Sequence, residues 1–114
     1  MKEDIIEFYE GKLLTSYENN NIIYLEKFCT CTDNREQYLY LVTKTTQEDI
    51  LRFRNKEITL NELFHEYSDD FDYYISQEER GIIVEVLKIK GSQIPESYKA
   101  KKDVFYEVEL AYDS

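Results

Sequence analysis

The sequence has few of the residues that organise catalytic sites or cross-link a fold. Its 114 residues include one histidine, two cysteines, one proline, three glycines and no tryptophan. The glycines stand apart at Gly11, Gly81 and Gly91. None of them opens a strand-to-helix turn followed by lysine and serine or threonine, so a phosphate-binding loop is excluded. We therefore expect a protein that is not an enzyme and that carries no cofactor.

The two cysteines, Cys29 and Cys31, are separated by one residue. On a strand both side chains lie on one face with Cα atoms about 6.5 Å apart, which disfavours a mutual disulfide. A structural zinc site needs four ligands, more than these cysteines and His65 supply in one copy. A metal shared across a homodimer stays an open alternative. Packing residues on a half-buried strand are the better interpretation.

Long apolar runs are also missing, and the chain opens on the polar residues Met1-Lys2-Glu3-Asp4. A signal peptide or a membrane span needs an uninterrupted apolar stretch. We expect one domain over residues 1–114 and a cytoplasmic location, in a bacterial cell or an infected host.

Acidic and aromatic residues are abundant. The 24 Asp and Glu residues outnumber the 14 Lys and Arg residues, which gives a formal net charge of −10, and the chain has 11 Tyr and 6 Phe. Such a surface repels nucleic acid and anionic membranes and attracts basic partners at long range. Tyrosine suits both half-buried strands and binding faces, since it joins a large apolar ring to a hydrogen-bonding tip. The expected partner is a protein with a basic surface.

The pattern of apolar residues predicts mainly strands. Asn19-Asn20-Asn21 predicts a hairpin between two of them, because asparagine tolerates positive φ. Residues 82–89 are apolar on both faces except at Glu85 and Lys88, which predicts a central strand. Residues 104–112 alternate, with Glu107 and Glu109 on the polar face. Strands are expected at residues 5–9 (or a helical turn there), 13–18, 22–30, 37–44, 71–76, 82–90 and 104–112.

Two stretches predict helices through their capping signals. Thr45-Thr46-Gln47-Glu48 and Thr59-Leu60-Asn61-Glu62 each place a hydroxyl three residues before a glutamate. The second stretch continues at helical spacing through Tyr67. Residues 91–102 are expected to form a long loop. The predicted fold is α+β: an antiparallel sheet of about five to six strands with two short helices packed on one side.

The order of these segments resembles a family of small uncharacterised bacterial and phage proteins. Members open with a D-G-P-L-L-F-like turn and strand, followed by a Tyr/Leu/Val-rich strand and a helical segment. The matching residues here are Glu10-Gly11-Lys12-Leu13-Leu14, residues 38–42, Glu48-Asp49-Ile50-Leu51, Lys56-Glu57-Ile58-Thr59-Leu60 and Phe64. Lys12 replaces the family's proline, Asn61 stands where arginine is common, and the glycine between the helices is missing. The resemblance implies the fold and no activity.

Other candidate sites have simpler interpretations. His65 is the one candidate general base, but it stands without a patterned partner. Asp69, Asp70 and Asp72 offer oxygen ligands for a cation, but an EF-hand loop would need a different order, so a solvated turn is expected. The basic clusters Arg52, Arg54, Lys56 and Lys99, Lys101, Lys102 are expected to pair with neighbouring acidic residues.

The remaining feature of the sequence is a set of acidic residues and tyrosines on the faces of predicted strands. Glu85 and Asp113 belong to the acidic part of this set. This set predicts an anionic surface that imitates nucleic acid and occupies a basic groove on a partner. The predicted partner-binding residues are Asp69, Asp70, Asp72, Tyr73, Tyr74, Tyr106, Glu107 and Glu109. An acidic surface that only maintains solubility is the plainer interpretation.

Three functions follow as hypotheses. The first is a non-enzymatic inhibitor, for example a phage-encoded counter-defence protein that blocks a basic surface of a host protein. The second is an immunity protein that neutralises a basic toxin. The third is a small enzyme or small-ligand binder that uses His65 and nearby carboxylates in a tyrosine-lined cavity.

Overall fold

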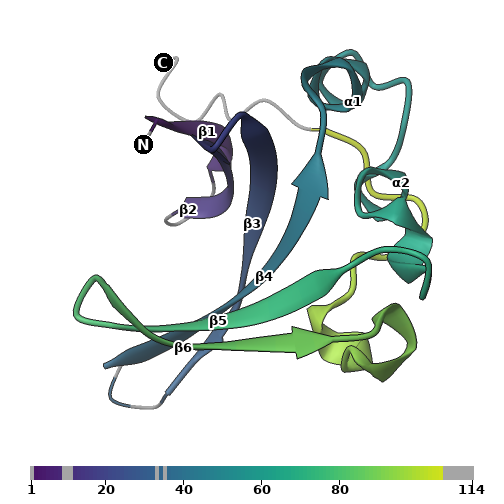
Figure 1. The fold of residues 1–114 in the computed structure, drawn as a ribbon. Helices are drawn as coiled ribbons and strands as arrows, with labels where there is room; N and C mark the ends of the chain where they lie inside the picture. The colour runs from purple at the N-terminus through teal and green to yellow at the C-terminus, as the bar shows by residue number, and fades with distance from the viewer. Residues whose placement is uncertain (1, 9–11, 33, 35, 107–114) are drawn as a thin grey trace, which may run out of the picture.

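The computed structural model describes residues 2–8, 12–32, 34 and 36–106. Within these residues, six antiparallel strands form one sheet in sequence order, and two helices lie between the fourth and fifth strands in the chain. This arrangement confirms the predicted α+β class (Figure 1). The elements are β1 Lys2–Phe8, β2 Lys12–Asn19, β3 Ile22–Cys31, β4 Gln37–Thr45, α1 Gln47–Arg54, α2 Leu60–Leu63, β5 Tyr73–Glu79 and β6 Ile82–Ile89.

Two tight turns set the register of the sheet. Asn20 and Asn21 have φ values of 54° and 65° between β2 and β3, which confirms the predicted hairpin and its reason. Arg80 and Gly81 adopt φ values of 55° and 81° between β5 and β6. Two consecutive residues at positive φ give a turn whose twist matches that of the flanking strands. This turn joins β5 directly to the edge strand β6.

The helices begin at capping hydroxyls. The Thr59 Oγ1 accepts a hydrogen bond from the Glu62 backbone N–H at 3.1 Å, and a Glu62 carboxylate oxygen accepts from the Thr59 N–H at 2.9 Å. This reciprocal pair confirms the second predicted capping box. The first helix is capped one residue later than expected, by Thr46, whose hydroxyl accepts from the Asp49 N–H. Thr45 remains the last residue of β4.

The prediction of a longer second helix was wrong. The α-helix ends at Leu63, and His65–Tyr67 form a 3₁₀ turn in which all three residues have positive φ, between 54° and 60°. L-residues rarely adopt this left-handed conformation. Leu63, Phe64 and Tyr67 are nevertheless all buried, so the helical spacing identified core residues although the backbone reverses its hand.

The core lies on one face of the sheet, which we call the covered face. Its strand residues include Leu14, Leu25, Leu41 and Tyr73, which pack with helix residues such as Phe53. In Figure 1 both helices lie on the same side of β4. Residues 91–102 contain two 3₁₀ turns, at Gly91–Gln93 and Glu96–Tyr98, where a loop was expected. Residues 104–106 of the predicted last strand are not in a strand, and residues 107–112 lie outside the described residues.

Candidate functional site

The opposite side of the sheet, which we call the open face, is defined by two cross-strand rows. Directly paired residues of neighbouring antiparallel strands have their side chains on one face. One row runs across four strands through Glu26, Val42, Tyr74 and Lys88, and the next through Phe28, Tyr40, Ser76 and Val86. Val42 and Ser76 are buried on this face, so it is exposed only in part, but Val42 is not part of the core formed with the helices. The open face is therefore distinct from the helix-packed core.

Aromatic rings dominate the open face. Phe28 contacts Tyr40 edge-on with centroids 5.8 Å apart, and Tyr38 lies 6.0 Å from the same ring. Tyr17 and Tyr24 stack at 5.4 Å on strands β2 and β3. These rings are half-buried and hold one another in place. Rigid half-exposed tyrosines are the residues that protein interfaces favour.

Strand β6 borders both faces and lies at the edge of the sheet. The expectation of a central strand was therefore wrong. Five of its apolar side chains are between 51% and 67% exposed: Ile82, Ile83, Val84, Val86 and Leu87. Leu87 is paired through Ile75 with the fully buried Leu41 on the covered face. Leu87 thus extends past the cover that buries Leu41 in the same row.

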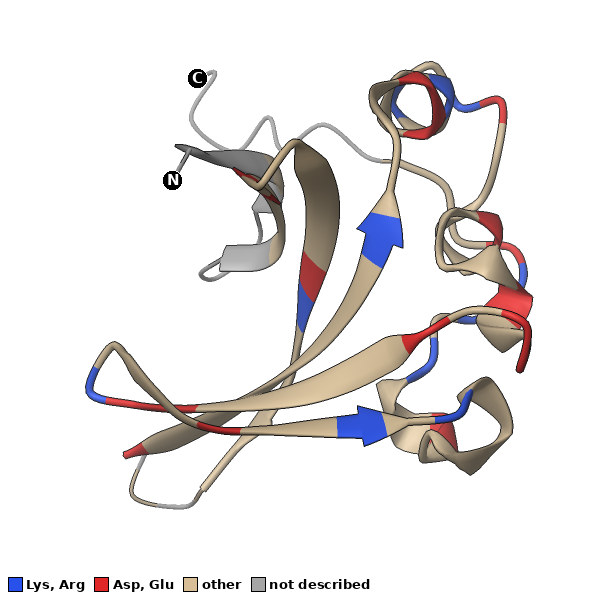
Figure 2. Cartoon of the chain, viewed as in Figure 1, with Lys and Arg blue, Asp and Glu red and all other residues tan. Residues whose placement is uncertain are grey.

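The two charges of β6 lie in different settings. The Lys88 ammonium is 3.5 Å from an Asp72 carboxylate oxygen, which pairs it with the start of the neighbouring strand. Glu85 is exposed, and within the described part of the chain no ion pair or hydrogen bond joins its carboxylate to another side chain. In Figure 2 most of β6 is uncharged, with one acidic and one basic segment. The edge is thus apolar with a single unmatched negative charge.

The predicted acid–tyrosine surface is not assembled as expected. Tyr73 has no exposed surface and donates its hydroxyl hydrogen to the Phe64 carbonyl at 2.5 Å, so it is a core residue and its assignment to a binding face was wrong. Tyr74 points to the open face and is half-buried. Tyr106 is half-buried and meets the Phe53 ring edge-on at 5.5 Å. Asp70 and Asp72 are exposed, and Glu107 and Glu109 lie outside the described residues.

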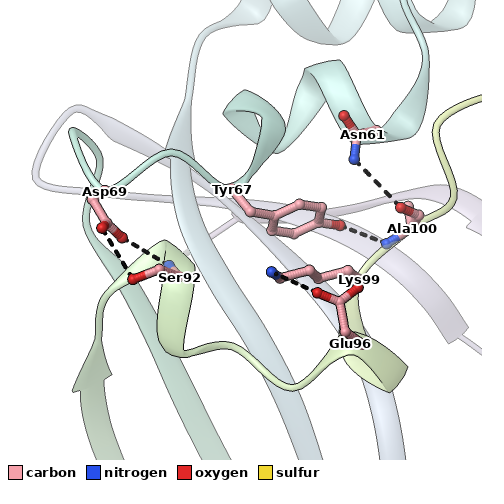
Figure 3. A network of polar contacts seen from close by, with 7 residues as sticks. All are labelled: Asn61, Tyr67, Asp69, Ser92, Glu96, Lys99 and Ala100. Carbon is pink, nitrogen blue, oxygen red and sulfur yellow. Dashed lines mark hydrogen bonds and ion pairs between the residues drawn. The ribbon is translucent and has the colours of Figure 1, made fainter.

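Asp69 has a structural contact with the segment that follows β6. Its carboxylate accepts hydrogen bonds from the backbone N–H of Ser92 at 2.7 Å and from the Ser92 hydroxyl at 3.0 Å (Figure 3). These bonds stabilise the ionised form and lower the pKa of Asp69 below its usual value. The carboxylate thus fastens residues 91–100, which we call the clasp, to the turn before β5.

The clasp is held again at its other end. The backbone N–H of Ala100 donates to the Tyr67 hydroxyl at 2.7 Å, and the Asn61 amide donates to the Ala100 carbonyl at 3.4 Å. The Lys99 ammonium lies 5.7 Å from the centre of the Tyr67 ring and bonds Glu96 at 3.2 Å. Burial raises the pKa of Tyr67 to about 12. The contacts drawn in Figure 3 therefore hold the clasp against the rest of the fold and stabilise it.

His65 has a structural setting too. Its ring stacks on Phe71 with centroids 3.9 Å apart and planes 7° from parallel. Its Nε2 lies 2.8 Å from the Lys44 carbonyl, an acceptor, so Nε2 carries the proton and donates it. This contact fastens the left-handed turn to the end of β4. The geometry therefore gives His65 a positioning role in the fold.

The cysteines and basic clusters follow the simpler interpretations. Cys29 and Cys31 are free and half-buried, and burial raises the pKa of the Cys29 thiol, the opposite of what an activated nucleophile needs. Among the described residues no group of three metal-binding side chains occurs. Arg52 pairs with Asp49 at 3.7 Å and Lys99 with Glu96, as expected for local charge pairs.

Comparison of the chain with protein-family models, curated proteins and solved structures gives no match. In the described part of the chain no helix is long and apolar enough to cross a membrane. The open face and β6 were missed as a site by sequence reasoning. Their signal was the doubly apolar pattern of residues 82–89, which was interpreted as burial.

Proposed function

We propose that this chain is a non-enzymatic protein-binding module that binds a basic partner through β6 and the adjoining open face. The observation that carries the proposal is the exposure of five apolar side chains on a single edge strand. Contiguous exposed apolar surface of this kind is typical of interaction sites, because leaving it in water is unfavourable. The tyrosines of the open face extend it as a rigid surface.

The net charge supports the basic nature of the partner. A formal charge of −10 creates a field that attracts positively charged proteins and repels nucleic acid. The apolar strand would supply contact area and the surrounding acid would speed association. We therefore expect added salt to slow association without abolishing binding. At 0.1 M salt, charge–charge attraction is screened beyond about 10 Å, whereas apolar contacts stay intact.

The proposal is tested by affinity capture from host lysate with two matched variants. Leu87 on β6 and Leu51 on α1 are 59% and 55% exposed, so Leu87→Gln and Leu51→Gln remove similar apolar surfaces. We expect Leu87→Gln to lose the captured protein at least about tenfold and Leu51→Gln to retain it. A partner retained equally by both variants, at low and at high salt, would refute a binding site on β6.

The inhibitor and immunity functions are two versions of this proposal. Both need a basic target, and they differ in whether that target is a host protein or a toxin encoded nearby. A neighbouring toxin gene supports the immunity version, and a cluster of phage genes supports the counter-defence version. The enzyme hypothesis draws no support from His65, since its ring is engaged by Phe71 and the Lys44 carbonyl.

A further inference from the structure

Strand β6 has the side-chain pattern of an internal strand in an edge position. In the internal strand β4, Leu41 and Val42 point to opposite faces and are both buried. In β6, Leu87 and Val86 occupy the same two faces and are both more than half exposed. A strand that is apolar on both faces is typical of a strand buried on both faces, and such a strand rarely lies unpaired at a sheet edge.

We propose that β6 accepts an added strand, an extended segment of a basic partner protein whose lysine or arginine faces Glu85. This inference rests on the proposed function and names the form of the partner. An extended segment that adds to a sheet edge gains main-chain hydrogen bonds along its length, and alternate side chains then give specificity.

The backbone of β6 is regular where the added strand would pair. The register with β5 is continuous from Glu85 to Ile89 and shifts only beyond Glu85, where Val84 is passed over. At an edge, every second residue directs its N–H and C=O groups away from the sheet. A five-residue regular stretch matches the usual length of a strand. The irregularity at Val84 therefore limits the pairing site to one end of β6.

Charge decides which kind of segment fits that site. Lys88 already pairs with Asp72, whereas Glu85 is exposed with no ion pair to another described residue. A basic side chain directly across from Glu85 supplies the missing charge, and an apolar one across from Leu87 covers it on the same face. The long-range field of a chain with a net charge of −10 favours the same segment.

A second copy of the chain fits less well. In a two-fold antiparallel pair, facing residues are both odd-numbered or both even-numbered, because facing side chains share one face and alternate along the strand. Glu85 of one copy therefore never faces Lys88 of the other. Centring the pair on Val86 sets Glu85 against Leu87, and centring it on Glu85 sets two carboxylates together. Each register leaves Glu85 without a cationic partner.

The test uses two fluorescent peptides of roughly ten residues, enough to span a strand. Valine and threonine alternate in both, with one central lysine in the first and one central glutamate in the second. We expect the lysine peptide to bind the full chain and the glutamate peptide to bind about tenfold more weakly. Glu85→Lys should reverse that preference. Glu57→Lys makes the same charge change at an exposed site between the helices. This variant should keep the preference for the lysine peptide.

Backbone amide exchange shows where the peptide lies. Strand addition should slow exchange at alternate amides from Glu85 to Ile89 when the lysine peptide is present. Binding that leaves these amides unprotected would place the peptide on the open face, so strand addition would be wrong while the protein-binding function stood. Strand addition is also overturned if neither peptide binds at millimolar concentration, or if Glu85→Lys and Glu57→Lys shift the preference equally.

Self-association is the remaining outcome. Protection of the β6 amides that grows with protein concentration in the absence of peptide, with a matching dimer in sedimentation, would assign the edge to a second copy and refute the proposed partner. Failure of the proposed function itself is read separately, from lysate capture by Leu87→Gln. Strand addition can therefore fail while the proposed function stands, and the two failures are distinguishable.

Discussion

Strands β4 and β6 are similar in sequence and opposite in surroundings. Both are rich in leucine, valine and isoleucine or tyrosine, and both belong to one antiparallel sheet. Leu41 in β4 has no exposed surface, whereas Leu87 in the same cross-strand row is 59% exposed. The difference arises from what lies beside each strand and not from its own residues. An apolar strand sequence therefore indicates that its side chains are to be buried. It does not indicate whether the residues that bury them belong to the same chain or to a partner.

The covered region also contains a glycine, Gly91, with no room for a side chain. A Cβ atom added at Gly91 would lie 2.0 Å from the Tyr67 carbonyl oxygen, while one added at Gly81, in the β5–β6 hairpin, would meet nothing within 4 Å. We expect Gly91→Ala to lower the free energy of unfolding by about 4 kcal/mol, since backbone must move.

The control is Gly81→Ala, which should cost about 1 kcal/mol because alanine disfavours the positive φ of that turn. Urea denaturation of both variants measures the difference. Equal losses would show that the clasp does not press on the left-handed turn.

A matched pair of truncations tests the comparison of β4 with β6 directly. Leu41→Ala should destabilise the fold by about 3 kcal/mol, the cost of a cavity in a packed core. Leu87→Ala should cost less than about 0.5 kcal/mol, because the side chain is already in water. The free energies come from chemical denaturation of the two variants. A large loss for Leu87→Ala would mean that β6 is covered in solution.

The smallest effect concerns pH and again belongs to the covered region. Burial raises the pKa of Tyr67 from 10.0 to about 12 and raises that of Tyr73 as well. Because the folded state holds these protons more tightly, their stabilisation is complete below about pH 10 and is lost as the pH rises through the folded-state values.

Tyr67→Phe should make this alkaline loss less steep, at a cost of about 1 kcal/mol near neutral pH for the lost Ala100 hydrogen bond. The measurement is chemical denaturation at a series of alkaline pH values. Tyr73→Phe should reduce the same slope. An unchanged slope in both variants would contradict the burial argument.

Local features of the fold were predictable from the sequence. The hairpin at Asn20 and Asn21 and the capping box of Thr59 and Glu62 depend on residues a few positions apart, so their chemistry is visible in the chain. The acidic turn at Asp69 and Asp70 was expected for the same reason. Segments whose conformation is decided by near neighbours are the ones that pattern reasoning recovers.

Long-range features were not predictable in the same way. The edge position of β6 depends on which segment pairs with it, and its apolar pattern is common to both outcomes. The reversal at His65–Tyr67 depends on contacts with Lys44, Gly91 and Ala100, which no local spacing reveals. Tyr73 and Tyr74 are adjacent in sequence, and only the register decides which one enters the core.

The left-handed turn at His65–Tyr67 has a consequence for the order of folding. Three successive L-residues in this conformation each cost about 1–2 kcal/mol, so the segment does not adopt it alone. The arrival of Gly91 and Ala100 supplies the compensating contacts to Tyr67. The turn and the clasp must then form in one cooperative step and open in one step. Although distant in sequence, they are expected to behave as a single folding unit.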